Sequence, residues 1–150
     1  MIVRMAIDRD TGQARIERLV WVDDAGRIIS PALANGQLLG GLAQGIGQAL
    51  MERIVYDESG QLLTGSFLDY ALPRAADMPR VELESMSIPA TANLLGAKGV
   101  GEAGTIGVPA ALLNAAIDAL SPFGVTGLDF PLTAECLWRT IKSSTTECHP

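Results

Sequence analysis

One acidic side chain stands in a stretch of backbone that is otherwise cleared by glycine. Glu102 is flanked by Gly99, Gly101 and Gly104, so little side-chain bulk lies beside its carboxylate. The residues that follow predict a helix, whose first turn offers unpaired N–H groups and the positive end of a dipole. A carboxylate in this setting can act as a general base while a bulky ligand lies against the glycines. It can also simply cap the helix, which on these residues alone is the more common role.

The same loop matches a nucleotide-binding pattern. Residues 99–104 read G-x-G-x-x-G, which in dinucleotide-binding folds follows a buried strand and precedes a helix. Those folds also place an acidic residue about twenty positions further on. The preceding segment 93–98 lacks the pattern of a strand, and Asp118 falls inside the predicted helix. A nucleotide-binding module built on this loop therefore stays as an alternative that its surroundings do not favour.

A second glycine cluster, residues 36–47, surrounds a pair of glutamines. Gln44 and Gln48 are four residues apart, so they share one face of a helix. A glutamine amide both donates and accepts hydrogen bonds, which suits recognition of a heterocycle or an oxo group. The glycines let either a ligand or a neighbouring helix approach closely. Ligand contact and helix packing both remain open here.

Helices and short strands must position these two clusters. Apolar residues at spacings of three and four predict a helix within 31–55, and an alanine- and leucine-rich run predicts another over 109–120, with Pro109 near its start. A last helix, capped by Thr133, is expected to end at Ile141. Alternation and turn signals predict strands at 1–8, 14–22 and 81–88, with shorter candidates at 28–30 and 123–128. These elements predict an α+β fold with a mixed, mainly antiparallel sheet and packed helices.

The composition predicts one globular domain. The chain has 150 residues, of which 48% are hydrophobic and 19% charged. We expect residues 1–141 to form the domain and 142–150 a flexible polar tail. A net charge of −6 without a Lys/Arg cluster argues against nucleic-acid binding.

The sequence also bears on location and on other classes of site. No long apolar run follows Met1, so we expect a cytoplasmic protein without a membrane-spanning segment. His149 is the single histidine, which argues against a histidine-based zinc site or a Ser-His-Asp triad. Cys136 and Cys148 could pair, and the sequence does not decide whether they do.

Four motifs in order along the chain resemble one family. The chain is similar to the C-terminal part of the molybdenum-cofactor-binding large subunit of the molybdenum hydroxylases, the family of xanthine oxidase, aldehyde oxidase and carbon monoxide dehydrogenase. The resemblance extends from about residue 2 to residue 141. The motifs that carry it are residues 36–50, 63–74, 96–104, and 129–133 followed by Trp138.

The resemblance implies an oxidoreductase and a cofactor. The cofactor is a molybdenum ion on molybdopterin, usually as the cytosine dinucleotide in bacterial members. Glu102 matches the glutamate that takes a proton from the attacking hydroxyl, and no residue here is expected to bind the metal directly. The positions that match cofactor-lining residues of the family are Gln44, Gly45, Lys98, Gly99, Val100 and Gly101.

The short length of the chain limits what it does alone. A full molybdenum subunit is several times longer, so the resemblance implies a partner polypeptide that carries the rest of the site. Iron–sulfur and flavin subunits or domains and a small-molecule substrate are implied as well. We expect the isolated chain to be inactive and to bind no molybdopterin stably. A truncated, non-catalytic fragment or assembly module that folds without cofactor is the main alternative.

Overall fold

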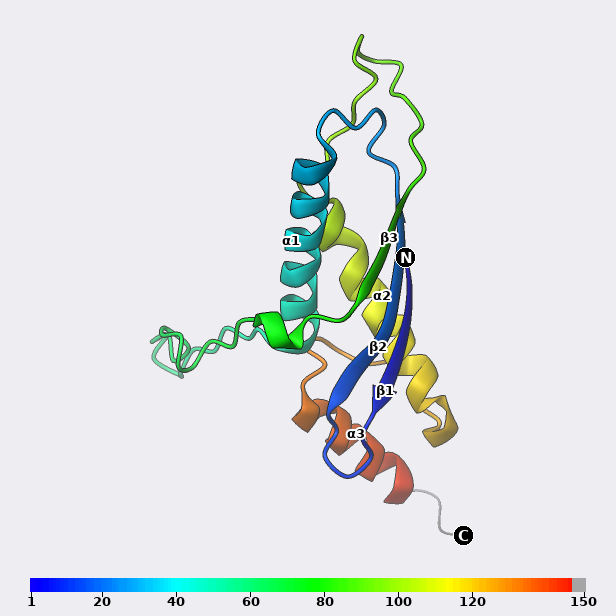
Figure 1. The fold of residues 1–150 in the computed structure, drawn as a ribbon. Coiled ribbons are helices and arrows are strands. Elements are labelled where there is room, and N and C mark those ends of the chain that lie inside the picture. The colour runs from blue at the N-terminus through cyan, green and yellow to red at the C-terminus, as the bar shows by residue number, and fades with distance from the viewer. Residues whose placement is uncertain (147–150) are drawn as a thin grey trace.

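A three-stranded sheet in the order β1-β2-β3 forms one layer of the fold (Figure 1). Residues 1–146 are described, from a computed structural model. Strands β1 (Ile2–Ile7) and β2 (Ala14–Asp23) pair as an antiparallel hairpin, and β3 (Val81–Ser85) pairs with β2 in parallel. The turn of the hairpin is closed by Asp8, whose carboxylate accepts the backbone N–H groups of Asp10 and Thr11.

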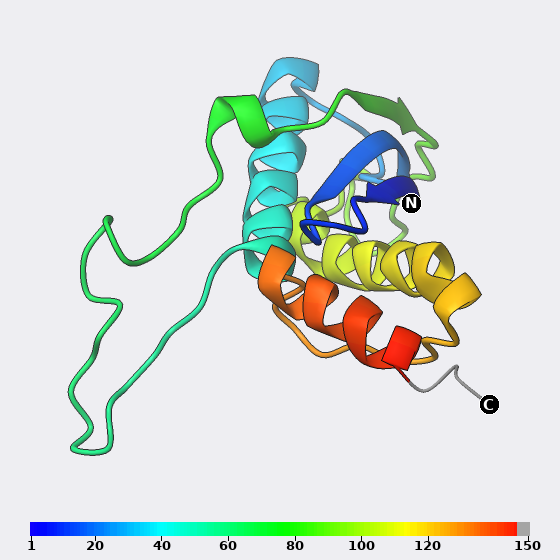
Figure 2. The same cartoon turned by 90° about the horizontal axis from the view of Figure 1, so that it is seen from below.

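Helix α2 (Ala103–Leu120) packs against this sheet, and the other helices are arranged around it. Helix α2 lies against β1, α1 (Pro31–Leu50) crosses α2, and α3 (Ala134–Thr146) closes one end (Figures 1 and 2). Two short 3-10 helices, η1 (Ala75–Asp77) and η2 (Ser121–Phe123), complete the elements. The largest fully buried side chains share one continuous core and are Leu19, Leu42, Ile46, Val108, Leu112, Leu120, Leu132 and Leu137.

The expected α+β class is confirmed, with differences at the helix ends. Helix α1 starts at Pro31 but ends at Leu50. The apolar spacing continues to Ile54, but Ile54 lies on an extended arm, where its side chain is 62% exposed and packs in no core. Helix α2 begins at Ala103, so Pro109 lies inside the helix and not near its start. The small residues before Pro109 continue the helix because they pack on α1.

The three principal strands are confirmed, while the two short candidates are wrong. Residues 28–30 form the loop into α1, and η2 followed by Gly124 (φ 76°) turns the chain where a strand was expected. Thr133 caps α3 as predicted, accepting the N–H of Cys136 at 3.3 Å. The helix runs on to Thr146, and the rest of the expected tail, with Cys148 and His149, lies outside the described residues.

Residues 52–73, called the arm below, leave the body between α1 and η1. Figure 2 shows the arm reaching outward as two lengths of chain that run side by side. At its base the hydroxyl of Tyr70 donates to Glu52 Oε2 at 2.7 Å. This hydrogen bond joins the two lengths of the arm where they leave the body.

Helix α2 is the one element in the described part of the chain with the length and composition of a membrane span. The mean hydropathy is 1.4 over Ala103–Phe123. Core helices have the same composition, and the buried face of α2, with Val108 and Leu112 fully covered, packs in the protein core. The hydropathy of α2 alone therefore assigns no membrane.

Candidate functional site

Glu102 occupies the position immediately before helix α2. Its backbone carbonyl accepts the N–H groups of Thr105 (3.0 Å) and Ile106 (3.1 Å), which starts the helix. Its side chain makes no capping hydrogen bond and is exposed. In the described residues the carboxylate also has no ion-pair partner. Capping by the side chain, the competing sequence interpretation, is thus not what this geometry shows.

The start of α2 lies against the middle of α1 because both helices carry glycine there. A Cβ on Gly104 would lie 2.5 Å from both the carbonyl oxygen of Leu38 and the nitrogen of Leu42. A Cβ on Gly41 would lie 3.0 Å from the Cα of Gly104, so the two backbones are in contact. These glycines serve helix packing.

Two predicted site residues each lie within one helical turn of this crossing. Glu102 precedes Gly104 by less than one helical turn, and Gln44 follows Gly41 by less than one turn. Both Glu102 and Gln44 are exposed. The polar groups predicted to face the cofactor are therefore on the same part of the fold.

Gly45 lies on the buried side of α1. A Cβ there would lie 2.8 Å from the Cβ of Val108, so the absence of a side chain is required by the packing of α1 on α2. A direct role for Gly45 at a ligand stays a prediction that this contact does not support.

A different group of glycines has open space beside it. Built Cβ atoms on Gly36 and Gly40 of α1, and on Gly99 and Gly101 of the loop, would meet no described atom within 4 Å. Packing within this chain therefore does not explain these glycines. Bare backbone facing open space is what a large ligand needs for close approach.

Gln37 ties the glycine loop to α1, a role that the sequence did not reveal. Its amide Nε2 donates to the carbonyl oxygen of Gly101 at 3.1 Å, next to Glu102. The contact joins residues 64 positions apart. The one sequence signal was the place of Gln37 in the 36–50 motif.

Lys98 and Val100 hold the loop in place through contacts within the chain. Lys98 Nζ pairs with Asp24 Oδ2 at 2.6 Å, and the Lys98 N–H donates to the carbonyl of Ala25 at 3.0 Å. Val100 is half-buried against the core. An acidic partner already holds the Lys98 ammonium group, and the contact of Lys98 with a cofactor stays a prediction.

Asp24 collects several donors at this anchor. Lys98, followed by the backbone N–H groups of Gly26 and Ile88, holds the pKa of Asp24 below its ordinary value, because each favours the charged carboxylate. The glycine loop is thus fastened by charge on one side and by Gln37 on the other.

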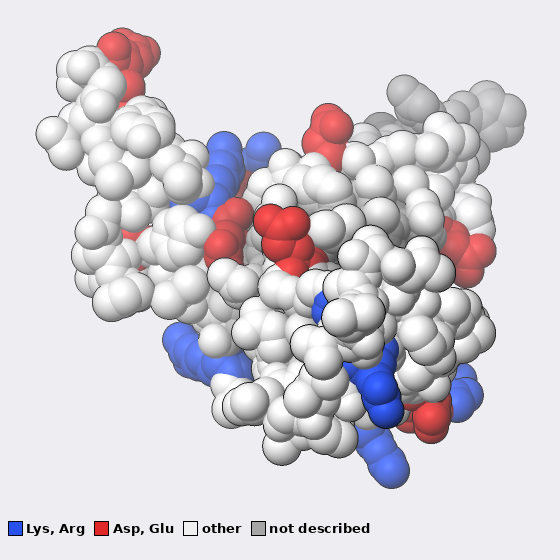
Figure 3. Space-filling model, turned by 90° about the horizontal axis from the view of Figure 1, so that it is seen from above, with Lys and Arg blue, Asp and Glu red and all other residues white. Residues whose placement is uncertain are grey.

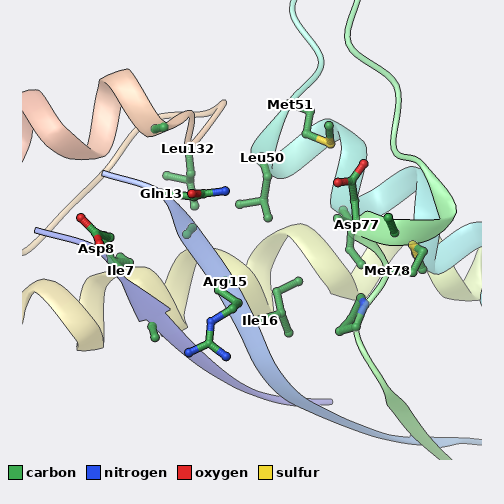
Figure 4. A pocket seen from close by; sticks show the side chains of 16 residues that line it. Ile7, Asp8, Gln13, Arg15, Ile16, Leu50, Met51, Asp77, Met78 and Leu132 are labelled. Carbon is green, nitrogen blue, oxygen red and sulfur yellow. The ribbon is translucent and has the colours of Figure 1, made fainter. Parts of the chain in front are cut away.

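Two pockets flank α1, and only the smaller borders the site. It measures about 330 Å³ and is lined by Gln37, Lys98 and Val100, among other residues. The larger, about 800 Å³, lies beyond the other end of α1, between the hairpin, Leu50 and η1 (Figure 4). It contains no predicted site residue, so its size does not mark it as the site.

We also searched for a basic surface patch and for clusters of metal-binding side chains. On the face drawn in Figure 3, Lys and Arg side chains are scattered among acidic ones without forming a basic patch. Through residue 146, no three His, Cys, Asp or Glu side chains gather where they could hold a metal ion.

Comparison with known proteins gives the family. Residues 1–79, more than half of the chain, match the molybdopterin cofactor-binding domain. The chain belongs to this family. The chain is 43% identical over 136 residues to the large subunit of nicotine 6-hydroxylase from Paenarthrobacter nicotinovorans. It is 36% identical over 136 residues to the carbon monoxide dehydrogenase large chain from Hydrogenophaga pseudoflava. Each match covers 91% of this chain and 17% of the relative.

The fold comparison agrees with this molybdopterin-binding family. The crystal structure of Cu,Mo-CO dehydrogenase in its carbon monoxide reduced state matches with a TM-score of 0.90 and 35% identity. This match covers 94% of the present chain and 18% of that chain. The expected family and fold are confirmed, and the chain spans less than a fifth of the length of these relatives.

Proposed function

We propose that this chain forms one wall of a molybdopterin-dependent oxidoreductase site and that Glu102 is the general base of that site. The observation that carries the proposal is the exposed carboxylate of Glu102, which does not cap the helix. The backbone of Gly99 and Gly101 beside it has open space over it. The oxidised substrate is a small molecule, in keeping with the nicotine and carbon monoxide in the names of the relatives.

The residues present fit one edge of such a cofactor. Gly99 and Gly101 let a large flat group lie against the backbone, and the exposed amide of Gln44 can pair with its polar atoms. Lys98 and Val100 keep the loop in shape behind this surface. When bound, the molybdenum group supplies the acceptor for the electrons removed from the substrate. We propose the cytosine dinucleotide form.

Glu102 would move the proton in this reaction. An ionised carboxylate accepts a proton from the oxygen nucleophile as that oxygen attacks an electron-poor carbon, provided that it lies within hydrogen-bond reach. The Gln37 bond to Gly101 and the helix start fix the backbone on both sides of Glu102. The open face beside it must be closed by another part of the enzyme, which would exclude bulk water.

The test is Glu102→Gln in the assembled enzyme. We expect normal molybdenum and pterin content with turnover reduced by about 10²–10⁴-fold, the usual contribution of a general base. Glu84→Gln on exposed β3 is the matched control and should keep full turnover. Turnover of Glu102→Gln near the wild-type rate would show that the base is elsewhere.

The other functions weighed from the sequence make different predictions. A non-catalytic assembly module predicts that the assembled enzyme turns over equally well with either glutamate variant. A nucleotide-binding module needs a strand before the glycine loop. The segment just before that loop is not a strand and forms an isolated bridge between Gly26 and Ala97. We further propose iron–sulfur and flavin partners and a cytoplasmic location, as the family resemblance implies.

A further inference from the structure

The arm carries large apolar side chains that no described residue covers. Phe67 is 87% exposed and Leu68 is 93% exposed. The other exposed large apolar residues of the arm are Ile54, Tyr56, Leu62, Leu63 and Leu72. Seven exposed large apolar side chains therefore lie within the 22 residues of the arm, and such a concentration of apolar surface is typical of an interaction site.

The arm is nevertheless a defined structure. At its outer part, Asp57 and Leu63 donate backbone N–H bonds to Gln61 (3.0 Å) and Val55 (2.8 Å), and Tyr56 pairs with Leu62 in an isolated bridge. The Asp57 carboxylate accepts hydrogen bonds from Ser59 and Gln61, so the turn is closed by groups of the arm itself. The backbone of the outer arm is thus shaped before any partner is present.

The base of the arm fixes its direction. Tyr70 bonds to Glu52 across the two lengths of chain. Pro73 packs on Gly47, where a Cβ would lie 2.7 Å from the ring Cγ, so a larger residue would displace the base. The arm therefore leaves the end of α1 in a set direction.

The arm belongs to the fold that the chain shares with its longer relatives. The match to the carbon monoxide dehydrogenase structure covers 94% of this chain, which leaves too few residues outside the match to omit the arm. In that structure the matched region is only 18% of the chain. Outside the matched region, that longer chain therefore offers surface that can cover the arm.

We infer that the arm is the docking element through which this chain binds the part of the molybdopterin-binding large subunit that it lacks. The partner surface is an apolar groove that receives Phe67 and Leu68. This inference rests on the proposed function, since it names the partner that completes the same site.

The experiment co-expresses the tagged chain with the rest of the large subunit and measures, by pull-down over a range of concentrations, how strongly the two bind. Phe67→Ser combined with Leu68→Ser should weaken binding by at least about tenfold, because buried aromatic and aliphatic anchors dominate such interfaces. The double variant should fold normally, since neither side chain packs in the core. Ile2→Ser, which alters a 74% exposed residue on β1 across the molecule from the arm, is the control and should bind like wild type.

A second measurement does not depend on variants. Backbone amides of the outer arm, such as Leu63, should exchange with deuterium more slowly in the assembled enzyme than in the free chain. Unchanged exchange, or equal affinity of the double variant and wild type, overturns the inference while leaving the role of Glu102 intact. Normal arm-dependent binding in an assembly that takes up no pterin supports the inference and contradicts the proposed function.

Discussion

Asp24 shows how single residues set the shape of the glycine loop. Its carboxylate receives the Lys98 ammonium and the N–H groups of Gly26 and Ile88. These donors come from the turn after β2 and from the long loop that leads to Glu102. One charged side chain thus holds together two segments that are distant in sequence.

The lowered pKa of Asp24 makes this anchor dependent on pH. A carboxylate whose pKa is lower in the folded than in the unfolded chain stabilises the fold above about pH 4, and loses that effect as the pH falls through the folded value. We expect Asp24→Asn to melt below wild type at pH 7, with a difference that shrinks between pH 4 and about pH 2. Thermal melts over this range test the expectation.

The control for this variant is an aspartate without such donors. Asp129 is exposed and, in the described part of the chain, makes no side-chain hydrogen bond or ion pair. Asp129→Asn should leave the melting temperature close to wild type at both ends of the range. A deficit of Asp24→Asn that is the same at pH 7 and pH 2 would contradict the assignment.

Part of the site was visible in the residues, and part was not. The glycines around Glu102 indicated an accessible carboxylate from local sequence alone. The partners of Lys98 and Gln37 could not be predicted, because Asp24 and Gly101 reach them only through tertiary structure. Local patterns therefore identified the acid, whereas the groups that fix its loop required the fold.

At the scale of elements, the crossing of α1 and α2 depends on backbone contact. Besides the glycine contacts, Thr105 Oγ1 donates to the carbonyl of Gly41 at 3.4 Å, which helps to fix the crossing. Replacing Gly104 with alanine would place a methyl group 2.5 Å from backbone atoms of α1 that cannot move aside. The helices would have to separate.

We expect Gly104→Ala to lower the free energy of unfolding by about 1–3 kcal/mol, the usual cost of overpacking. Gly107→Ala in the same helix is the matched control, because its Cβ would have only the Met1 Cε at 3.9 Å as a neighbour. That variant should be neutral or more stable by up to about 1 kcal/mol, since alanine favours helix over glycine. Urea unfolding of both variants tests the pair, and equal effects would show that the crossing tolerates a side chain.

The elements themselves were predictable where they obey local rules. The β1-β2 hairpin followed from two apolar runs joined by a turn, and the Thr133 cap from residue type. The parallel pairing of β3 and the true start of α2 were not predictable locally. Both depend on packing between distant segments: β2 against β3, and Gly104 against α1.

At the scale of the whole molecule, the proposed site is one wall with an open face. Cβ atoms built on Gly99 and Gly101 would meet no described atom within 4 Å. We therefore expect the purified, isolated chain to contain far less than one molybdenum or pterin per molecule. Metal analysis and pterin fluorescence measure this content, and stoichiometric amounts of both would contradict the expectation. The chain assembled with its partner polypeptide is the positive control.

Helix α1 joins the two regions of the molecule to which we assign a function. It is 20 residues of continuous helix, about 30 Å long, with the crossing to α2 in its middle and the arm at its C-terminal end. Its length therefore sets both the separation and the rotation between the docking element and the loop of Glu102. One inserted residue between Gly41 and Leu50 would turn the arm by about 100° relative to Glu102. The number of residues in this span is thus a specificity determinant for assembly, even though few of their side chains would touch the partner.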